Sequence, residues 1–303
     1  MTYNPNLEAI LDTPEIRELK KQDFAIQRKV FGANSINAIS QLPKVDVIET
    51  DIKLDNGTTL RHYKPNQPSD KALLFIHGGG WCVGSIDTYD HVCRYLCDNG
   101  KFNIFSLEYG LAPEYPFPTA VNQSLDAYDW LYANATKFDV KAENIFVMGD
   151  SAGGNLVTII CHERQTNMPK AQILVYPATD MYTKYDSHAK FGKYKYHLDS
   201  EWCDKFLNAY VEGISLEEFK NPQISPLFYE NTKQPDTLII AATHDMLIDG
   251  IHAYEQKLKA KGVLVETHYD DEMFHGFIST VGTVPFKNAE VALDKAIKFI
   301  NTK

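Results

Sequence analysis

The sequence lacks the long apolar segments that would anchor it in a membrane or direct it out of the cell. No stretch of its 303 residues approaches the roughly 18 apolar residues that a membrane-spanning helix needs. Residues 1–12 also contain no basic segment followed by an apolar core, which is the pattern of a secretory signal peptide. We therefore expect a soluble, cytoplasmic protein without membrane insertion.

Basic residues and cysteines are both scarce. The 30 Lys and Arg residues are outnumbered by 40 Asp and Glu residues, so the formal net charge is −10 and the surface repels phosphate backbones. The five cysteines form an odd, scattered set, which suits reduced thiols better than a disulfide framework. Cys93 and Cys97 have helical spacing, but no second Cys or His pair is spaced as metal ligands are. We expect no nucleic-acid partner and no metal site.

Short apolar segments alternate with helical patterns through most of the chain. Asn56-Gly57, between residues 45–54 and 58–64, predicts a hairpin at the start. The later apolar segments are typical of parallel strands buried on both faces. This alternation predicts one α/β domain over residues 1–303, with a mostly parallel, twisted sheet and helices on both faces. Strands are expected at 72–76, 103–107, 144–148, 171–176, 237–242 and 263–269, and helices at 119–134, 151–163, 248–261 and 288–300.

Two segments do not fit this alternation. Residues 181–235 separate two consecutive strands, and a connection of that length is expected to form a small unit of its own. Residues 1–42 precede the hairpin and have a helical pattern, with apolar Leu7, Ile10 and Leu11 near their start. We predict that the two segments together form a small helical cap over the site.

Ser151 lies in Gly149-Asp150-Ser151-Ala152-Gly153, where a predicted strand runs directly into a predicted helix. The pentapeptide alone is a weak signal, but this strand–turn–helix context is what a nucleophile elbow requires. The glycines leave room for a tight turn that exposes the Ser151 hydroxyl, and the Ala152 amide can donate to a developing oxyanion. The alternative is a serine that caps an ordinary helix.

A run of three glycines, residues 78–80, follows the strand expected at 72–76. Such a run loses much backbone entropy on folding, so the local structure must need its conformational freedom. In α/β hydrolases a glycine loop at this place completes the oxyanion hole. The alternative is a phosphate-binding loop, which would have Lys and Ser or Thr after the glycines, whereas Trp81 and Cys82 stand there.

A nucleophilic serine needs a neutral imidazole as its base, and a carboxylate to orient that imidazole. In α/β hydrolases the triad residues follow the chain order Ser, then the acid, then His, so the His base is expected after a late strand. Asp245 comes directly after the strand expected at 237–242, and His275 lies beside Gly276 in a loop after the last strand. Asp249 is the rival acid, but its place before a helical pattern favours N-capping. The rival bases are His244, His252 and His268.

Several motifs follow one another along the chain: His77-Gly78-Gly79-Gly80 with Trp81, Tyr109-Gly110-Leu111-Ala112-Pro113-Glu114 with Phe117-Pro118, GDSAGGN at 149–155, Ser225-Pro226-Leu227 and Phe274-His275-Gly276-Phe277. Together they resemble the hormone-sensitive-lipase-like esterases, and the resemblance spans most of residues 72–280. It implies a triad of Ser151, Asp245 and His275, and an oxyanion hole made by the amides of Gly79, Gly80 and Ala152. A helical cap is also implied, and a homodimer is compatible with the family. The family usually has Arg in place of Gly110 and Pro in place of Met246.

These residues predict a serine carboxylesterase that uses an acyl-enzyme and needs no cofactor. We expect a small-molecule ester with a short, acetyl-like acyl group, because the tyrosines of the predicted cap suggest a narrow pocket. An amidase or peptidase on the same triad is the nearest alternative. A non-catalytic small-molecule receptor on a hydrolase scaffold is the second. The tyrosines are Tyr182, Tyr185, Tyr194 and Tyr196.

Overall fold

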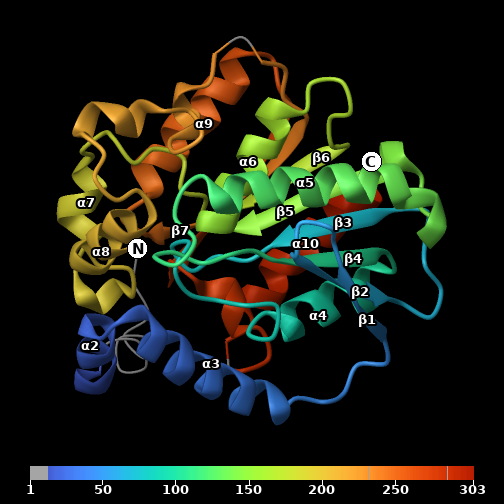
Figure 1. Ribbon diagram of the computed structural model, residues 1–303, viewed down its shortest axis with the longest axis horizontal. Coiled ribbons are helices and arrows are strands. Elements are labelled where there is room, and N and C mark those ends of the chain that lie inside the picture. Colours follow the sequence, from blue (N-terminus) through green and yellow to red (C-terminus); the bar gives the residue numbers. More distant parts are fainter. Residues whose placement is uncertain (1–12, 231, 285) are drawn as a thin grey trace.

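The computed structural model describes residues 13–230, 232–284 and 286–303. In this part of the chain, an eight-stranded sheet crosses the molecule in the order β1-β2-β4-β3-β5-β6-β7-β8 (Figure 1). The pairs β1–β2 and β2–β4 are antiparallel, and every later pair is parallel. The predicted, mostly parallel sheet is thereby confirmed. The bounds are β1 Ile48–Lys53, β2 Thr59–Lys64, β3 Ala72–Ile76, β4 Asn103–Glu108, β5 Ile145–Asp150, β6 Ala171–Val175, β7 Asp236–His244 and β8 Val265–Phe274.

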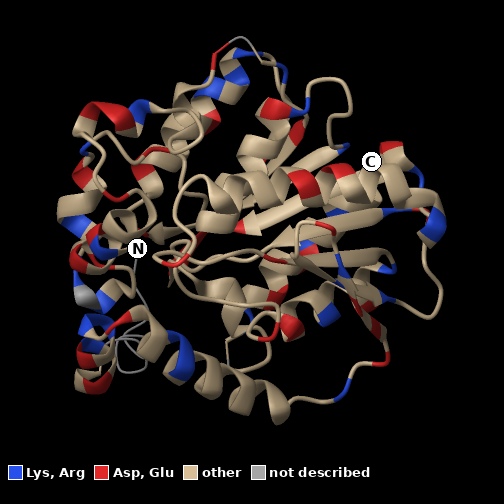
Figure 2. Cartoon of the chain, viewed as in Figure 1, with Lys and Arg blue, Asp and Glu red and all other residues tan. Residues whose placement is uncertain are grey.

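Helices cover both faces of the sheet (Figure 1). α4 (Asp90–Gly100) packs with α10 (Asn288–Asn301) on one face, and α5 (Thr119–Asn134) packs with α6 (Ala152–Glu163) on the other. α9 (Ile248–Ala260) connects β7 to β8. Charged residues gather on the outer helices and loops, and the strands β3 and β6 carry none (Figure 2). Every residue of these two strands is buried, as continuous apolar segments predict.

The hairpin forms at the predicted Asn-Gly turn. Gly57 has a φ of 85°, a conformation that favours glycine. The amide of Leu54 donates to the carbonyl of Thr58 at 2.9 Å, and the Asn56 side chain accepts from the Thr58 amide at 3.0 Å. The turn therefore sets the register that pairs Lys53 with Thr59.

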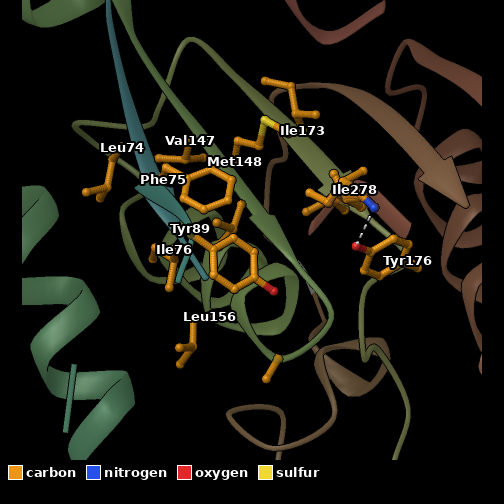
Figure 3. Packing of buried hydrophobic residues seen from close by; sticks show 14 of the residues in the cluster. Leu74, Phe75, Ile76, Tyr89, Val147, Met148, Leu156, Ile173, Tyr176 and Ile278 are labelled. Atoms are coloured by element: carbon orange, nitrogen blue, oxygen red, sulfur yellow. Dashed lines mark hydrogen bonds between the residues drawn. The ribbon is translucent and has the colours of Figure 1, made fainter. Parts of the chain in front are cut away.

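The core between the sheet and its helices is apolar and aromatic. Figure 3 shows Phe75 of β3 and Met148 of β5 packed near Tyr89, which precedes α4. On the far side of this cluster, the Ile278 amide donates to the Tyr176 hydroxyl at 3.3 Å (Figure 3). The core therefore extends to the carboxyl ends of the strands, where parallel sheets place their functional residues.

A group of helices lies over those strand ends, and we call it the covering layer. It consists of α2 (Pro14–Lys21), α3 (Phe24–Ser40), α7 (Asp186–Phe191) and α8 (Ser200–Tyr210). The ammonium of Lys20 in α2 donates at 2.8 Å to the carboxylate of Asp199, just before α8, and both side chains are buried. The N-terminal segment and the 181–235 insertion therefore lie side by side (Figure 1). Residues 1–12 of the predicted cap lie outside the described residues.

Three further findings concern the bulk properties of the chain. No helix within the described residues is both long and apolar enough to cross a membrane. The five cysteines are free, and Cys82, Cys93, Cys97 and Cys161 are buried. Within the same residues, no three His, Cys, Asp or Glu side chains are grouped as metal ligands.

Candidate active site

Ser151 lies in the turn between β5 and α6. Its φ of 53° and ψ of −117° are sparsely populated for a residue with a side chain, so the surrounding structure must hold it there. The Ser151 amide donates to the Val175 carbonyl at 2.9 Å, and its carbonyl accepts from the amides of Asn155 and Ala178 at 3.0 and 3.1 Å. These contacts fix the strained turn against β6 and α6.

The glycines on either side of Ser151 are required by close backbone contacts. A Cβ atom at Gly153 would lie 2.0 Å from the carbonyl oxygen of Ile76 in β3. One at Gly149 would lie 2.4 Å from the carbonyl group of Gly153. Real Cβ atoms do not approach backbone so closely, so larger residues would push α6 away from the sheet. The strand–turn–helix geometry expected from the sequence is present.

His275 and Asp245 meet Ser151 at the ends of neighbouring strands. Nε2 of His275 lies 2.8 Å from Oγ of Ser151, and Nδ1 of His275 lies 2.7 Å from Oδ2 of Asp245. The Asp245 carboxylate is buried, and its Oδ1 accepts from the Leu247 amide at 2.9 Å. The three side chains form one continuous hydrogen-bonded chain from carboxylate to hydroxyl.

The pairing of β7 with β8 explains why Asp245 and His275 are neighbours. A register shift after Ala242 pairs His244 with Phe274, the last residues of the two strands, and Asp245 and His275 follow directly after them. The strand β8 therefore extends to Phe274, through much of the segment expected to be a loop. The ring of Tyr176 packs against the His275 ring, with centroids 4.7 Å apart.

The other candidates for base and acid lie elsewhere. His244 stacks near Tyr196, and His252 packs against Tyr269 with ring centroids 5.1 Å apart. Asp249 does not cap its own helix, as the sequence pattern suggested. Its carboxylate instead accepts from the Ser187 amide at 2.9 Å, in the first turn of α7. The N-capping interpretation was therefore wrong, because α9 begins at Ile248 and Asp249 lies within its first turn.

The glycine loop lies beside Ser151 with its backbone in left-handed conformations. Gly79 and Gly80 have φ values of 114° and 57°, and Trp81 continues the loop at 59°. A Cβ atom at Gly79 would lie 2.1 Å from the Val83 carbonyl oxygen. Among the described residues, the amides of Gly79, Gly80 and Ala152 have no hydrogen-bond acceptor. Unused amides beside a serine hydroxyl are what an oxyanion hole needs.

Asp150 is part of the site, and the sequence analysis did not single it out. Its buried carboxylate accepts from the Gly78 amide at 2.8 Å and from the Tyr89 hydroxyl at 2.8 Å. It thus ties the serine turn to the glycine loop. Burial raises the pKa of the Asp150 carboxyl to about 6, against the opposing effect of these hydrogen bonds and of His275. In the sequence, the one sign of this role is that Asp150 is a charged residue at the end of an otherwise apolar strand.

A pocket of about 700 Å³ opens between the strand ends and the covering layer. Its wall combines Ser151, His275 and the glycine loop with apolar side chains of α3 and α8, including Phe31, Trp202 and Phe206. A mostly apolar wall with a few polar groups is typical of sites for small organic molecules.

The tyrosines expected to narrow this pocket do not line it. Tyr182 packs against Phe228, and the Tyr185 hydroxyl donates to Asp180 at 2.8 Å. Tyr196 packs against Phe191. None of these three tyrosines is among the described residues that line the pocket, and the Tyr194 side chain lies outside the description. The prediction that these tyrosines narrow the pocket was therefore wrong.

Comparison with known proteins identifies the fold and the family of the chain. A family model described as the α/β hydrolase fold matches residues 73–279. A solved structure described as the Francisella virulence factor BioJ is 68% identical, covers 100% of both chains and has a TM-score of 0.98.

Two curated relatives are ester hydrolases by name. The carboxylic ester hydrolase LipN of Mycobacterium tuberculosis is 30% identical over 92% of this chain and 77% of its own length. The ethyl acetate hydrolase of Pseudomonas putida is 29% identical, with 92% of each chain covered. The resemblance based on the sequence motifs is thus confirmed for the family.

Proposed function

The chain belongs to the hormone-sensitive-lipase-like ester hydrolases of the α/β-hydrolase fold, and from that premise we propose that it hydrolyses short-chain acyl esters through Ser151, His275 and Asp245. Hydrolysis of carboxylic esters is supported by the family as a whole. The single observation that carries the catalytic assignment is the continuous hydrogen-bonded chain from Asp245 through His275 to Ser151.

In the first half of the reaction, Oγ of Ser151 attacks the ester carbonyl carbon. Nε2 of His275, 2.8 Å away, takes the hydroxyl proton, while Nδ1–H donates to the Asp245 carboxylate. The C–O bond to the alcohol then breaks, and His275 returns the proton to the departing alkoxide. The acyl group remains on Ser151 as an ester.

The negative charge that develops on the carbonyl oxygen needs fixed donors. The amides of Gly79, Gly80 and Ala152 are proposed to supply them, because they lie beside Ser151 and have no acceptor among the described residues. Removing one such donor in a serine protease lowers kcat by about 10²–10³-fold, so three aligned amides are a large part of the rate enhancement.

In the second half, a water molecule attacks the acyl-enzyme. His275 takes a proton from this water and then returns one to Oγ of Ser151 as the carboxylic acid leaves. Each proton taken is given back, and neither a metal nor an organic cofactor enters the scheme. The covering layer is proposed to act as the cap that shields this step from bulk solvent.

The short acyl chain is supported by the relative named ethyl acetate hydrolase. The pocket volume of about 700 Å³ exceeds what an acetyl group fills, so the acyl preference rests on that relative and not on the pocket size. The remaining space can hold the alcohol part of the ester, against the apolar side chains of α3 and α8.

A chain-length series tests the substrate class. We would measure kcat/KM for p-nitrophenyl acetate, butyrate, hexanoate and decanoate, with Ser151→Ala as the blank. The proposal expects the highest kcat/KM for acetate or butyrate and a decline beyond them. A steady rise from acetate to decanoate would reject the short-chain preference, and equal rates for wild type and Ser151→Ala would reject the catalytic assignment.

A further inference from the structure

Arg28 of α3 reaches the segment that follows the glycine loop. Its Nε donates to the Cys82 carbonyl at 2.7 Å, and its Nη2 donates to the Ala112 carbonyl at 2.5 Å. Nη1 and Nη2 also donate to the two carboxylate oxygens of Glu114, at 2.9 and 2.8 Å. Cys82 lies two residues after Gly80, so one guanidinium fixes the end of the loop to two other parts of the chain.

Phe24, one helical turn before Arg28, acts on the same loop through α8. Its ring stacks on Phe206, with centroids 5.6 Å apart and an interplanar angle of 15°. Phe206 in turn covers Gly80, since a Cβ atom there would lie 2.3 Å from Cγ of Phe206. Helix α3 therefore holds the loop at two points, by hydrogen bonding at Cys82 and by packing at Gly80.

The glycine loop needs this outside support because its own conformation is unfavourable. Three consecutive residues, from Gly79 to Trp81, have φ values of 114°, 57° and 59°. Within the loop, the amides of Cys82 and Val83 donate to the Gly79 carbonyl at 3.0 and 2.9 Å. Sparsely populated backbone conformations persist only where surrounding contacts determine them.

We propose that Arg28 is a positioning residue for the oxyanion hole, an inference that rests on the function proposed above. By holding the Cys82 carbonyl, Arg28 keeps the amides of Gly79 and Gly80 aimed at the place where the oxyanion forms. Interactions made only in the transition state act on kcat more than on KM. Docking of α3 and the rate of the chemical step are thereby coupled, although the helix does not carry a reacting group.

Three variants separate the contacts of Arg28. Arg28→Gln removes the guanidinium fork, and Arg28→Lys keeps the charge without the fork geometry. Glu114→Gln removes the ion pair but leaves both carbonyl bonds in place. Arg164→Gln is a matched control, because the Arg164–Asp129 pair has side-chain exposures of 25% and 50%, against 24% and 51% for Arg28 and Glu114. Arg164 follows the far end of α6 from Ser151.

The experiment combines kinetics with hydrogen–deuterium exchange. For Arg28→Gln we expect kcat on p-nitrophenyl acetate to fall about 10- to 100-fold with little change in KM, since a misplacement of about 1 Å can lower rates about 100-fold. Arg28→Lys should recover part of this loss. Glu114→Gln and Arg164→Gln should stay near wild type. The peptide covering residues 78–84 should exchange faster in Arg28→Gln than in Arg164→Gln.

Two outcomes overturn the proposal. Unchanged exchange of residues 78–84 in Arg28→Gln would show that Arg28 does not hold the loop. A raised KM with unchanged kcat would make Arg28, which also lines the pocket, a substrate-binding residue instead. If wild type hydrolyses no ester, the proposed function fails, and the exchange measurement still decides whether Arg28 holds the loop.

Discussion

The strand ends that carry Ser151, Asp245 and His275 are built differently from the covering layer above them. At the strand ends, parallel pairing and close backbone packing fix the residues, as the register of β7 with β8 shows for Asp245 and His275. In the covering layer, a buried ion pair and aromatic stacks join segments that are far apart in the sequence, such as Lys20 with Asp199. The sheet therefore places the reacting groups, whereas long-range side-chain contacts place the pocket wall that faces them.

Apart from removal of the Ser151 hydroxyl itself, the largest expected effect comes from neutralising the carboxylate at the strand ends. Asp245→Asn should lower kcat by about 10⁴-fold, as the equivalent change does in a serine protease, because the amide favours the wrong imidazole tautomer. Asp249→Asn is the control, since Asp249 accepts a hydrogen bond from the Ser187 amide and does not touch His275. Steady-state kinetics on p-nitrophenyl acetate measure both. Similar losses in the two variants would contradict the assignment of Asp245.

A smaller effect is expected from breaking the ion pair of the covering layer. Lys20→Met leaves the buried Asp199 carboxylate without its partner and should lower the free energy of unfolding by about 3–5 kcal/mol. Adding Asp199→Asn should restore part of this stability, because the amide oxygen can still accept from the Trp202 amide. Urea denaturation measures the difference.

The exposed pair Lys141–Asp70 provides the control for that prediction. Its side chains are 62% and 40% exposed, so solvent screens this pair and Lys141→Met should lower stability much less than Lys20→Met does. Equal losses for Lys20→Met and Lys141→Met would show that burial does not set the contribution of the Lys20–Asp199 pair.

The smallest expected effect concerns Asp150, which joins the serine turn to the glycine loop. Burial raises its pKa from an ordinary 3.8 to about 6 in the folded protein. The folded state therefore holds this proton more tightly than the unfolded state, and stability falls as the pH rises from about 4 to about 6. The free energy of unfolding should fall by about 2–3 kcal/mol over this range, because the Asp150 pKa rises from 3.8 to about 6 on folding.

Asp150→Asn removes this titration. We compare the free energy of unfolding of the variant with that of wild type. As the pH rises from 4 to 7, the variant's value minus the wild-type value should become more positive by about 2–3 kcal/mol. Other groups titrate in both proteins and cancel in the difference. A difference that stays constant over this range would show that Asp150 does not titrate with a raised pKa.

Much of the strand-end region could be predicted from the sequence because its signals are local. The elbow around Ser151 follows from two glycines between a strand and a helix, and the structure has the same turn. The order of Asp245 and His275 along the chain placed them after late strands. Their contact could not be derived, because it depends on the register shift after Ala242.

The covering layer could be predicted only as two helical segments. The contacts of Arg28 with Cys82 and of Phe24 with Phe206 join residues 54 or more positions apart, and no local pattern marks them. The positions of the tyrosines could not be predicted for the same reason, since the Tyr185 hydroxyl donates to Asp180 and Tyr185 does not line the pocket. Asp150 was missed because a carboxylate under a glycine loop has no periodic signal.

In the proposed mechanism Ser151 carries the acyl group during turnover, and mass spectrometry of rapidly quenched reactions tests this step most directly. With p-nitrophenyl acetate as substrate, we expect an acetylated peptide that contains Ser151 in wild type and no such peptide in Ser151→Ala. The Ser151→Ala variant should lose on the order of 10⁶ in kcat. Acetylation of another residue, or undiminished turnover by Ser151→Ala, would contradict this mechanism.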